Sequence, residues 1–343
     1  MKLPAIICSD LHFTANPADE YRWAFWSWLA GELEAEKAQT LLILGDVTDA
    51  KDYHSAQLVN RLSTAFAELL ARFPHLQIRV LAGNHDWLRQ GGVFFKFLEH
   101  LDKRLTFITE PFEDLLDDGP ASYFLPYSKS PIKDWAGMDF SHYDYLFMHQ
   151  TAPGSIASNG QTMDGEELPP LNAGKVYSGD IHVPQTIGSV EYVGSPYHVH
   201  FGDAFTGRCI LIDRKRKTYE LHFKTISRLS VKVQGLRQLK KFELRAGDHI
   251  KLTVQLAASD LHDWKRIRRE CAEYLRSRSV EVHGLALETA SQRTRLAGTS
   301  SAAGVADPSR RMGPGDVVTR FVIDEELGAE MLDVGLDIVE QVR

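Results

Sequence analysis

Short apolar runs alternate with amphipathic stretches through the first part of the chain. Residues 2–10, 40–46 and 77–86 each form an apolar run that ends in charged or polar residues. Between them, residues 18–37 and 55–73 carry apolar side chains at helical spacing. Strands joined by helices in this way are typical of a largely parallel sheet that is covered on both faces. We therefore expect an α/β domain at the start of the chain.

Further along, short apolar runs follow one another with few helical stretches between them. This pattern favours a second sheet with more antiparallel pairing, because parallel pairs need long crossover connections. The two sheets together predict a four-layer α/β sandwich. The runs expected in the second sheet are residues 143–150, 174–182, 189–196, 208–214 and 218–224.

From Leu229 the pattern changes to that of a small α+β module. Residues 229–236, 248–256 and 280–289 have strand patterns, and residues 259–278 form a strongly amphipathic helical pattern. We expect a separate small domain here, with one helix packed on a short sheet.

The rest of the chain differs in composition from this module. Residues 291–313 are rich in Ser, Ala and Gly and contain no aromatic residue, which is typical of a flexible linker. Two short helical patterns around Gly328 then predict a C-terminal helical hairpin. The expected domains are 1–226, 227–290, 291–313 and 314–343.

The composition fits a soluble globular protein of more than one domain. The chain has 343 residues, of which 43% are hydrophobic and 25% are charged. No run approaches the roughly 20 apolar residues that a membrane span needs, so we expect no membrane association. The N-terminal run is short and ends in charged residues, which favours a first strand over a signal peptide.

The cysteine content points to a reducing compartment. Cys8, Cys209 and Cys271 are far apart and odd in number, so they do not suggest a disulfide framework. We expect a cytoplasmic protein.

Charge is distributed unevenly along the chain, although the net charge is only -7. Residues 1–200 carry 14 Lys and Arg against 26 Asp and Glu, whereas residues 208–278 carry 19 against 8. An acidic half followed by a basic segment fits a metal site joined to a phosphate-binding surface. Two solvated surfaces of opposite sign explain the same counts, and charge alone does not separate the two interpretations.

Polar side chains follow five of the expected strands at the point where each strand ends. The carboxyl ends of strands are where α/β sheets collect ligands and substrates, so these side chains can converge. The five ends are "SDLH" with Asp10 and His12, "GDVTD" with Asp46, "GNHD" with Asn84, His85 and Asp86, "FMHQ" with His149, and "YSGDIHVPQ" with Asp180 and His182.

Each of these pieces is weak evidence when it is taken alone. Asp-x-His is a common turn pair, Gly-Asp after a strand often begins a helix, and a single His on an apolar strand is normally a core residue. "GNHD" is more informative, because packing gives no reason for Asn-His-Asp at a strand end. The complete set, in this order, favours a metal site.

The set has the right members for two metal ions. Asp10, His12, Asp46 and His182 form one shell of nitrogen and oxygen ligands, and Asp46, Asn84, His149 and Asp180 form another. A shared carboxylate can bridge two divalent ions about 3.5–4 Å apart. Imidazole and carboxylate without thiolate suit Mn, Fe or Zn rather than a structural zinc.

This motif set resembles that of the calcineurin-like metallophosphoesterases, whose motifs run D-x-H, GD, GNH[DE], H and GHxH. Within that superfamily it is most similar to the SbcD-like nuclease subunits of DNA double-strand-break repair complexes. The "HVPQ" after the last pair and the stretch "YVGSPYHVHFGD", residues 192–203, carry this closer likeness. The resemblance covers residues 1–215 well, and residues 229–290 look like the capping domain of the family.

The resemblance implies a role for each candidate residue. The two metal shells fall on the residues given above, His85 falls on the transition-state histidine, and Asp86 falls on its orienting partner. One position departs from the family pattern, because Asp180 stands where the family usually has His. The pair His198 and His200 is an alternative to the H-x-H motif, but it lacks the preceding Gly and the "PQ" that follows.

The resemblance also implies an activity, cofactors and partners. It implies a nuclease with two divalent ions, Mn²⁺ in the first place and Mg²⁺ as the alternative. The expected substrate is DNA, degraded from 3′ ends as a duplex and cut internally as a single strand. The expected partners are an SMC-like ATPase of the SbcC type, docked by residues 314–343, and a second copy of this chain.

Two other functions share parts of this pattern. A small-molecule or nucleotide phosphodiesterase would have the same metal ligands, but it would not need the basic segment, the extra domain or the helical tail. A binding module with a site weakened at Asp180 is the second alternative, and the nearly complete ligand set argues against it.

Overall fold

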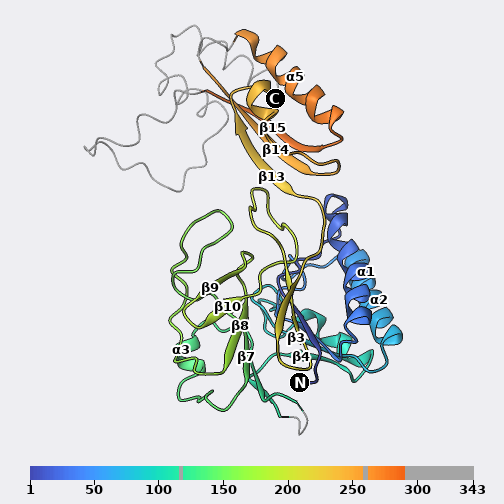
Figure 1. Ribbon diagram of the computed structural model, residues 1–343, viewed down its shortest axis with the longest axis vertical. Coiled ribbons are helices and arrows are strands. Elements are labelled where there is room, and N and C mark those ends of the chain that lie inside the picture. The colour runs from blue at the N-terminus through green and yellow to red at the C-terminus, as the bar shows by residue number, and fades with distance from the viewer. Residues whose placement is uncertain (116–118, 258–261, 290–343) are drawn as a thin grey trace, which may run out of the picture. The chain divides into compact units, whose positions relative to one another are not determined.

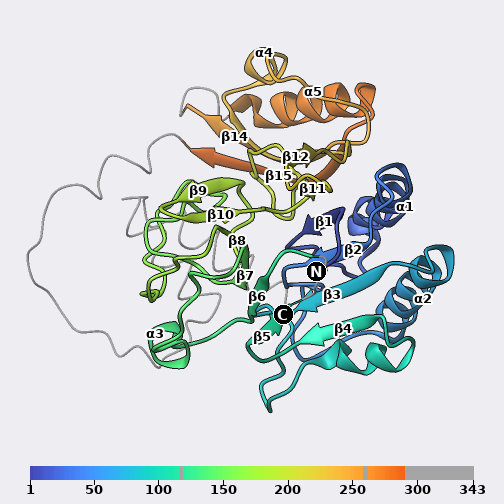
Figure 2. The same ribbon diagram turned by 60° about the horizontal axis from the view of Figure 1, so that its bottom comes forward.

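The computed structural model describes residues 1–115, 119–257 and 262–289 (Figure 1). Its first sheet has six strands in the order β12-β11-β1-β2-β3-β4. The strands β1 to β4 are parallel and lie side by side in Figure 2, and β11 pairs antiparallel with β1 and β12. Their bounds are β1 Ala5–Cys8, β2 Thr40–Ile43, β3 Gln77–Leu81, β4 Leu105–Ile108, β11 Cys209–Ile212 and β12 Thr218–Leu221.

Two helices cover one face of the first sheet, as Figure 1 shows. They are α1 Glu20–Ala35 and α2 Ala56–Arg72, and two short 3-10 helices, η1 Pro17–Asp19 and η2 Phe94–His100, lie outside them in sequence. The helix α2 begins where the Ser55 hydroxyl accepts a hydrogen bond from the Leu58 N–H, which satisfies one unpaired helix donor. The apolar side chains of both helices are buried against the sheet.

The aromatic residues of α1 belong to this core. Trp23, Phe25 and Trp26 are at most 7% exposed, and the rings of Phe13 and Trp26 stack at 5.4 Å. These aromatic side chains therefore pack in the core of the protein. By contrast, Phe97 and Leu101 near η2 are 43% and 48% exposed.

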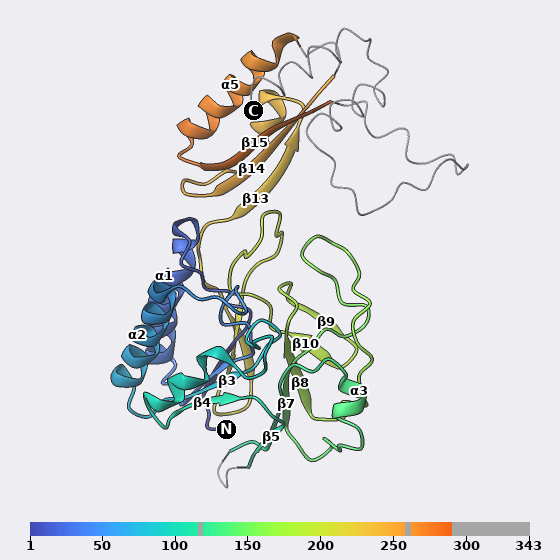
Figure 3. The same ribbon diagram turned by 180° about the vertical axis from the view of Figure 1, so that it is seen from behind.

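The second sheet packs against the other face of the first sheet. Its order is β5-β6-β7-β8-β10-β9, and buried side chains such as Ile7, Leu42, Phe147 and Tyr177 fill the space between the two sheets. On its outer face, the short helix α3 Pro131–Asp134 and adjoining loops cover a further apolar cluster (Figure 3). The strand bounds are β5 Phe112–Asp114, β6 Ser122–Leu125, β7 Tyr145–His149, β8 Lys175–Gly179, β9 Gln185–Ile187 and β10 Val190–Tyr192.

The pairing of the later strands differs from the prediction in two ways. The centre of the second sheet, β6-β7-β8-β10, is parallel, and only its two outermost pairs are antiparallel. The runs at 208–214 and 218–224 belong to the first sheet, where they extend it beyond β1. The second difference arises because β11 pairs antiparallel with β1 and β12 pairs with β11.

A third sheet of three parallel strands follows. It consists of β13 Arg228–Val233, β14 His249–Leu256 and β15 Glu281–Thr289, with α4 Leu236–Leu239 and α5 Trp264–Ser277 as the connections. This sheet and α5 have their own apolar cluster, which includes Leu252, Cys271 and Leu275. The predicted α+β module is therefore present, while the exact domain boundaries stay a prediction.

The α/β fold class with two large face-to-face sheets is confirmed. Cys8, Cys209 and Cys271 are free thiols and are buried. In the part of the chain that the structure describes, no helix combines the length and the apolar character that crossing a membrane requires. The predicted linker at 291–313 and helical hairpin at 314–343 lie outside the described residues.

Candidate metal centre

Five strand ends from two sheets deliver the candidate side chains to one place. Asp10, Asp46 and Asn84 follow β1, β2 and β3 of the first sheet, while His149 ends β7 and Asp180 follows β8 of the second. Ligand atoms of Asp10, Asp46 and His149 lie within 4.8 Å of one another. The carboxyl edges of the two sheets therefore meet at a single cluster.

The backbone at this cluster is held in an unusual conformation. Asp10, His12, Asp46 and Asp180 have positive φ angles of 53°, 43°, 54° and 81°. Residues other than Gly adopt such angles at a cost of about 1–3 kcal/mol each, and they do so most often at functional sites. The N–H groups of Asp10 and His12 donate to the carbonyl oxygens of Gly45 and Asp46, at 3.2 and 2.9 Å, which holds the two loops together.

One group of ligands gathers around His12. Its Nε2 atom lies 3.1 Å from Nε2 of His182, and ligand atoms of Asp10, His12 and His182 lie within 4.8 Å of one another. Nδ1 of His12 lies 3.4 Å from Oδ1 of Asp49, which orients the ring. Two imidazole nitrogens at this distance either share a proton or face a common cation, so this group can hold one ion.

Asp46 lies between this group and a second group, which consists of Asn84 and His149. Its Oδ2 atom is 3.5 Å from Nε2 of His12, and its Oδ1 atom is 3.4 Å from Nε2 of His149. The two oxygens of one carboxylate therefore face two imidazoles that come from different sheets. This is the arrangement expected of a carboxylate that bridges two ions.

Several buried polar atoms at the cluster lack a hydrogen-bond partner. Among the described residues they include Oδ2 of Asp10, Oδ1 of Asn84 and Nε2 of His149. Nδ1 of His149 lies 2.6 Å from the Leu44 carbonyl oxygen, which can only accept, so Nδ1 carries the proton and Nε2 presents its lone pair to the cluster. Because buried polar atoms are normally paired, these atoms fit metal ligands, and the donor set suits Mn, Fe or Zn.

Burial disfavours the charged forms of several candidate ligands, so it raises the pKa of their carboxyl groups and lowers that of their imidazoles. It raises the pKa of Asp10 to about 7 and lowers that of His12 to about 4. Burial, reinforced by the charge of Asp86, also raises the pKa of Asp46, and burial lowers the pKa of His182. Bound cations would compensate the crowded carboxylates and would bind the neutral imidazoles.

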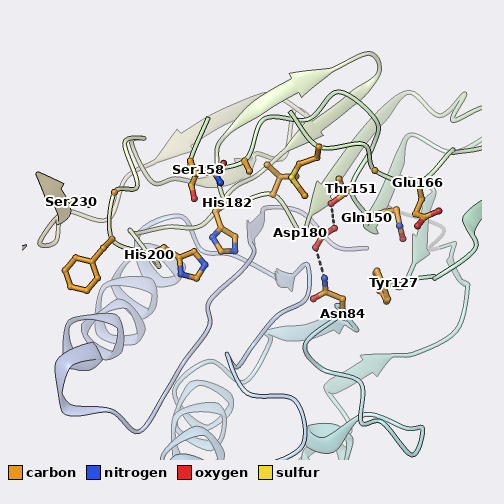
Figure 4. A pocket seen from close by; sticks show the side chains of 17 residues that line it. Asn84, Tyr127, Gln150, Thr151, Ser158, Glu166, Asp180, His182, His200 and Ser230 are labelled. Atoms are coloured by element: carbon orange, nitrogen blue, oxygen red, sulfur yellow. Dashed lines mark hydrogen bonds between the residues drawn. The ribbon is translucent and has the colours of Figure 1, made fainter. Parts of the chain in front are cut away.

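Asp180 lies beside the second group and is fixed by its neighbours (Figure 4). Its Oδ1 atom accepts a hydrogen bond of 2.9 Å from Nδ2 of Asn84 and lies 3.6 Å from Nε2 of His149. Its Oδ2 atom accepts a hydrogen bond from the Thr151 hydroxyl. This carboxylate orients Asn84 so that the amide oxygen is available as a ligand. That Asp180 itself ligates a metal stays a prediction.

Instead of contacting His85 through its carboxylate, as the resemblance implies, Asp86 binds backbone N–H groups. Its carboxylate is buried and accepts backbone hydrogen bonds from Gly83 and Asp46 at 2.8 Å and from Val47 at 3.1 Å. His85 is oriented instead by the Asp49 carbonyl oxygen, 2.6 Å from its Nδ1 atom. The assignment of Asp86 as the orienting partner of His85 is corrected accordingly: Asp86 fixes the two loops that carry Asp46 and His85.

Two further residues, Asp49 and Thr151, were not among the sequence-based candidates. Asp49 contacts His12 and orients His85, and the second Asp of "GDVTD" was the available signal. Thr151 holds Asp180 through a hydrogen bond, and its position two residues after His149 gave little indication of this.

The ring of His200 stacks on His182 at 5.2 Å, whereas His198 forms hydrogen bonds with Phe205 and Arg228. Of the alternative pair, only His200 therefore lies against a candidate ligand.

Gly45 shows how closely the second group is packed. It has a φ of 86°, and a Cβ atom at this position would lie 2.3 Å from Nδ1 of His149. Any side chain here would displace the imidazole. The Gly of the "GD" motif is therefore required by the position of His149.

A groove of about 900 Å³ opens beside the cluster (Figure 4). Asn84, Asp180 and His182 of the cluster line this groove, together with Phe201, Gly202 and Ser230. Among the residues that line it, none is Lys or Arg, and Glu166 and Asp180 are acidic. The remaining lining residues are Tyr127, Gln150, Thr151, Ala157, Ser158, Asn159, Met163, Gly165, Ile181 and His200.

Comparison with known protein families gives a match over the part of the chain that holds this cluster. Residues 3–184 match the family model described as calcineurin-like phosphoesterase. A comparison with curated proteins gives no match. Among solved structures, the chain is similar to the crystal structure of Pseudomonas putida nuclease MPE, with 16% identity and a TM-score of 0.33, over 63% of this chain and 87% of that one.

Proposed function

The chain belongs to the calcineurin-like phosphoesterase family, and from this premise we propose that it is a nuclease that hydrolyses phosphodiester bonds in DNA. Family membership makes it a metal-dependent phosphoester hydrolase. The finer assignment to DNA is supported by the basic segment 208–278, which contains 19 Lys and Arg residues but only 8 Asp and Glu residues.

The observation that carries the chemistry is the position of Asp46 between two imidazoles. Asp10, His12, Asp46 and His182 would hold one divalent ion, and Asp46, Asn84 and His149, with Asp180, the other. When bound, a pair of such ions lowers the pKa of water and offsets negative charge on a phosphoryl group. We assign Mn²⁺ to these sites, with Mg²⁺ as the alternative.

The protein's own residues position this chemistry. Nδ1 of His85 donates to the Asp49 carbonyl oxygen, so the other ring nitrogen, Nε2, is the one that can face a substrate. In the imidazolium form, which carries a proton on each ring nitrogen, the Nε2 proton can stabilise charge on the phosphoryl oxygens and pass to the departing oxygen, which leaves His85 neutral. Asp86 keeps the loop of His85 in place through three backbone hydrogen bonds.

Replacement of His85 tests this role. His85→Gln should leave the metal content unchanged and lower cleavage of linear duplex DNA with Mn²⁺ about 10²–10⁴-fold, the usual contribution of general acid–base catalysis. His222→Gln is the matched control, because His222 is an exposed imidazole whose Nδ1 likewise lies 3.0 Å from a backbone carbonyl oxygen, that of Gly207, and it is not part of the cluster. Wild-type cleavage rates in purified His85→Gln would overturn the assignment.

The polarity of degradation and the assembly are also part of the proposal. On the resemblance to SbcD-like subunits, we assign 3′-to-5′ degradation of duplex DNA and internal cutting of single strands, within a complex with an SMC-like ATPase that serves DNA repair and recombination. End-labelled duplexes and circular single strands test this directly. Release of label from 3′ ends last rather than first would contradict the polarity.

A second candidate function is a phosphodiesterase for nucleotides or other small substrates. It is favoured by one observation, the absence of Lys and Arg from the lining of the groove. Plasmid DNA and bis-p-nitrophenyl phosphate separate the two functions when both are assayed with Mn²⁺. A DNA nuclease should cleave plasmid DNA with much the higher kcat/KM, and the reverse order would favour the small-substrate enzyme.

A further inference from the structure

Three side chains at the start of β14 and β15 form a group that the proposed active centre does not use. Nε2 of His249 lies 3.3 Å from Oε2 of Glu281, and Nε2 of His283 lies 3.3 Å from Oε1 of the same carboxylate. The two imidazole rings are 4.5 Å apart. One ligand atom from each residue lies within 4.8 Å of the other two.

A β-bulge accompanies this group. His249 pairs with Glu281 and Ile250 with Val282, but Lys251 pairs with Gly284, so His283 is the extra residue of β15. Bulges interrupt the regular ladder and often lie next to functional sites, where they redirect a side chain. The chain therefore departs from regular pairing at the one residue that completes the group.

The separations are compatible with one ion between the three side chains. Ligands at about 2.0–2.1 Å from a zinc ion, at tetrahedral angles, lie about 3.3–3.4 Å from one another. Each of the two nitrogen-to-oxygen separations is close to this value, with Nε2 of His249 facing Oε2 of Glu281 and Nε2 of His283 facing Oε1. A small rotation of this exposed carboxylate would present one oxygen to both imidazoles. In addition, Nε2 of His283, the atom that faces Glu281, is buried and has no hydrogen-bond partner among the described residues.

The surroundings allow a cation at this position. Arg228 lies near His249, but its Nη1 atom is 3.1 Å from Oδ1 of Asp19, so the two charges compensate each other. Glu281 then supplies the negative charge for an ion, and its side chain is 60% exposed, which leaves the group open to solvent on one side.

The group also lies where the three-stranded sheet contacts earlier parts of the chain. The ring of His249 meets Tyr21 of α1 at 5.6 Å, and the ring of His283 meets Phe201 at 5.2 Å. All of these residues belong to the compact unit Met1–Ser291. An ion bound here would fix the two histidines that make these ring contacts.

We propose that His249, Glu281 and His283 form a separate metal site that binds a divalent ion of the zinc type, with one position open to solvent. Two imidazoles and one carboxylate are a common zinc ligand set and suit zinc better than Mg²⁺ or Ca²⁺, which take oxygen ligands. The ion acts as a clamp between the starts of β14 and β15 and the side chains of Tyr21 and Phe201.

The competing explanation is an ion-paired cluster without metal. The pair of His222 and Glu220 provides the comparison, because its nitrogen-to-oxygen separation of 3.4 Å is similar but a second imidazole is not part of it. His222→Gln is therefore the matched control for substitutions in the proposed site.

Metal binding to the full-length chain tests the proposal. After removal of metals with a chelator, Zn²⁺ binding is followed by calorimetry, and Co²⁺ binding by the visible absorption that tetrahedral cobalt gives. Glu281→Gln and His283→Gln should each bind one Zn²⁺ fewer per chain than wild type and His222→Gln. They should also lose the tetrahedral cobalt absorption, while Mn²⁺-dependent phosphodiester cleavage persists.

Two features keep the result decisive. Glu281 is exposed, so Glu281→Gln should fold even if the His283 variant does not. His283→Cys should retain Zn²⁺ binding, because a thiolate is a zinc ligand but cannot replace an imidazole in an ion pair with Glu281. Equal Zn²⁺ stoichiometry in wild type and Glu281→Gln, or loss of binding in both His283→Gln and His283→Cys, would overturn the proposal.

Discussion

Asp10 links metal binding to pH at the scale of a single side chain. Burial raises its pKa to about 7 in the metal-free protein, against an ordinary value of 3.8. The folded state therefore favours the protonated carboxyl, a contribution to stability that is fully present below pH 3.8 and is lost as the pH rises through about 7. A bound cation needs the ionised form, so it must displace this proton below about pH 7.

We therefore expect Mn²⁺ to raise the melting temperature more at about pH 8 than at about pH 6. His12, whose pKa burial lowers to about 4, stays neutral in the folded protein across this range. Its pH effect on folding is shared by the metal-free and metal-loaded proteins, so it cancels in the difference. Thermal unfolding with and without Mn²⁺ measures the effect, and a metal-induced shift independent of pH would contradict it.

Asp180 makes a second prediction at this scale. A carboxylate is a harder ligand than the imidazole usual in the family, so it should favour Mn²⁺ or Mg²⁺ over softer ions. Asp180→His should move the metal preference of cleavage toward Zn²⁺ or Co²⁺. Asp180→Ala, which also releases Asn84, should raise the Mn²⁺ concentration needed for half-maximal activity roughly 10–100-fold.

Metal titrations of cleavage rate decide this, with Thr151→Val as the control that removes a hydrogen bond but keeps the carboxylate. If Asp180→Ala shows the metal dependence of wild type, Asp180 neither binds the ion nor positions Asn84.

The sequence was informative about which residues converge, and less so about what each one does. Strand ends place Asp10, Asp46 and His149 at one edge by simple topology. Whether a carboxylate such as Asp86 faces an imidazole or three backbone N–H groups depends on loop conformations at positive φ, which residue order does not specify. Asp49 was missed as the partner of His85, because its backbone oxygen rather than its side chain orients that ring.

At the scale of elements, strand existence was easier to predict than strand partners. The side chains of β11 alternate between the two apolar clusters, with Cys209 and Leu211 toward the helices and Ile210 and Ile212 toward the second sheet. Such a strand is apolar throughout, so its pattern does not reveal which sheet it joins. Its place is fixed by pairing with β1, about 200 residues earlier in sequence.

The helix α5 carries the clearest prediction about DNA at this scale. It presents exposed Lys265, Arg266 and Arg269 within the basic segment. Each phosphate contact that is lost should flatten the salt dependence of DNA binding by about 0.9 in the slope of log K against log salt. Arg266 already binds Asp263 and Glu270, at 2.6 and 3.0 Å, so its replacement should matter least.

Alanine variants at the three positions, measured by DNA binding at several salt concentrations, test this order. Arg61→Ala, which removes an exposed Arg paired with Glu20 far from this segment in sequence, is the control. Slopes identical to wild type in all three variants would mean that α5 presents a solvated face and does not contact DNA.

At the scale of the whole molecule, the main question is what the C-terminal residues bind. The structure shows a compact unit that ends at Ser291, directly after β15. Truncation after Ser291 should therefore preserve the fold and metal-dependent cleavage. If residues 314–343 dock an SMC-like ATPase, as we propose, the truncated protein should lose co-purification with that subunit.

Gel filtration and unfolding of the truncated protein check that it is intact, and co-expression with the ATPase checks the docking. Full co-purification of the truncated chain would place the contact within residues 1–291. A change in its elution volume would show whether the expected second copy also binds through the tail.

The contact between His12 and His182 joins positions 170 residues apart, and it has a consequence for how the protein acquires activity. Loop closure over this length has an entropic cost that the packing of both sheets must offset, so we expect these imidazoles to meet only once the sheets have formed. Metal capture is then a late step in folding. During synthesis on the ribosome, a chain that has not yet released residue 182 lacks one of the candidate metal ligands, so we expect hydrolase activity only after the domain is built.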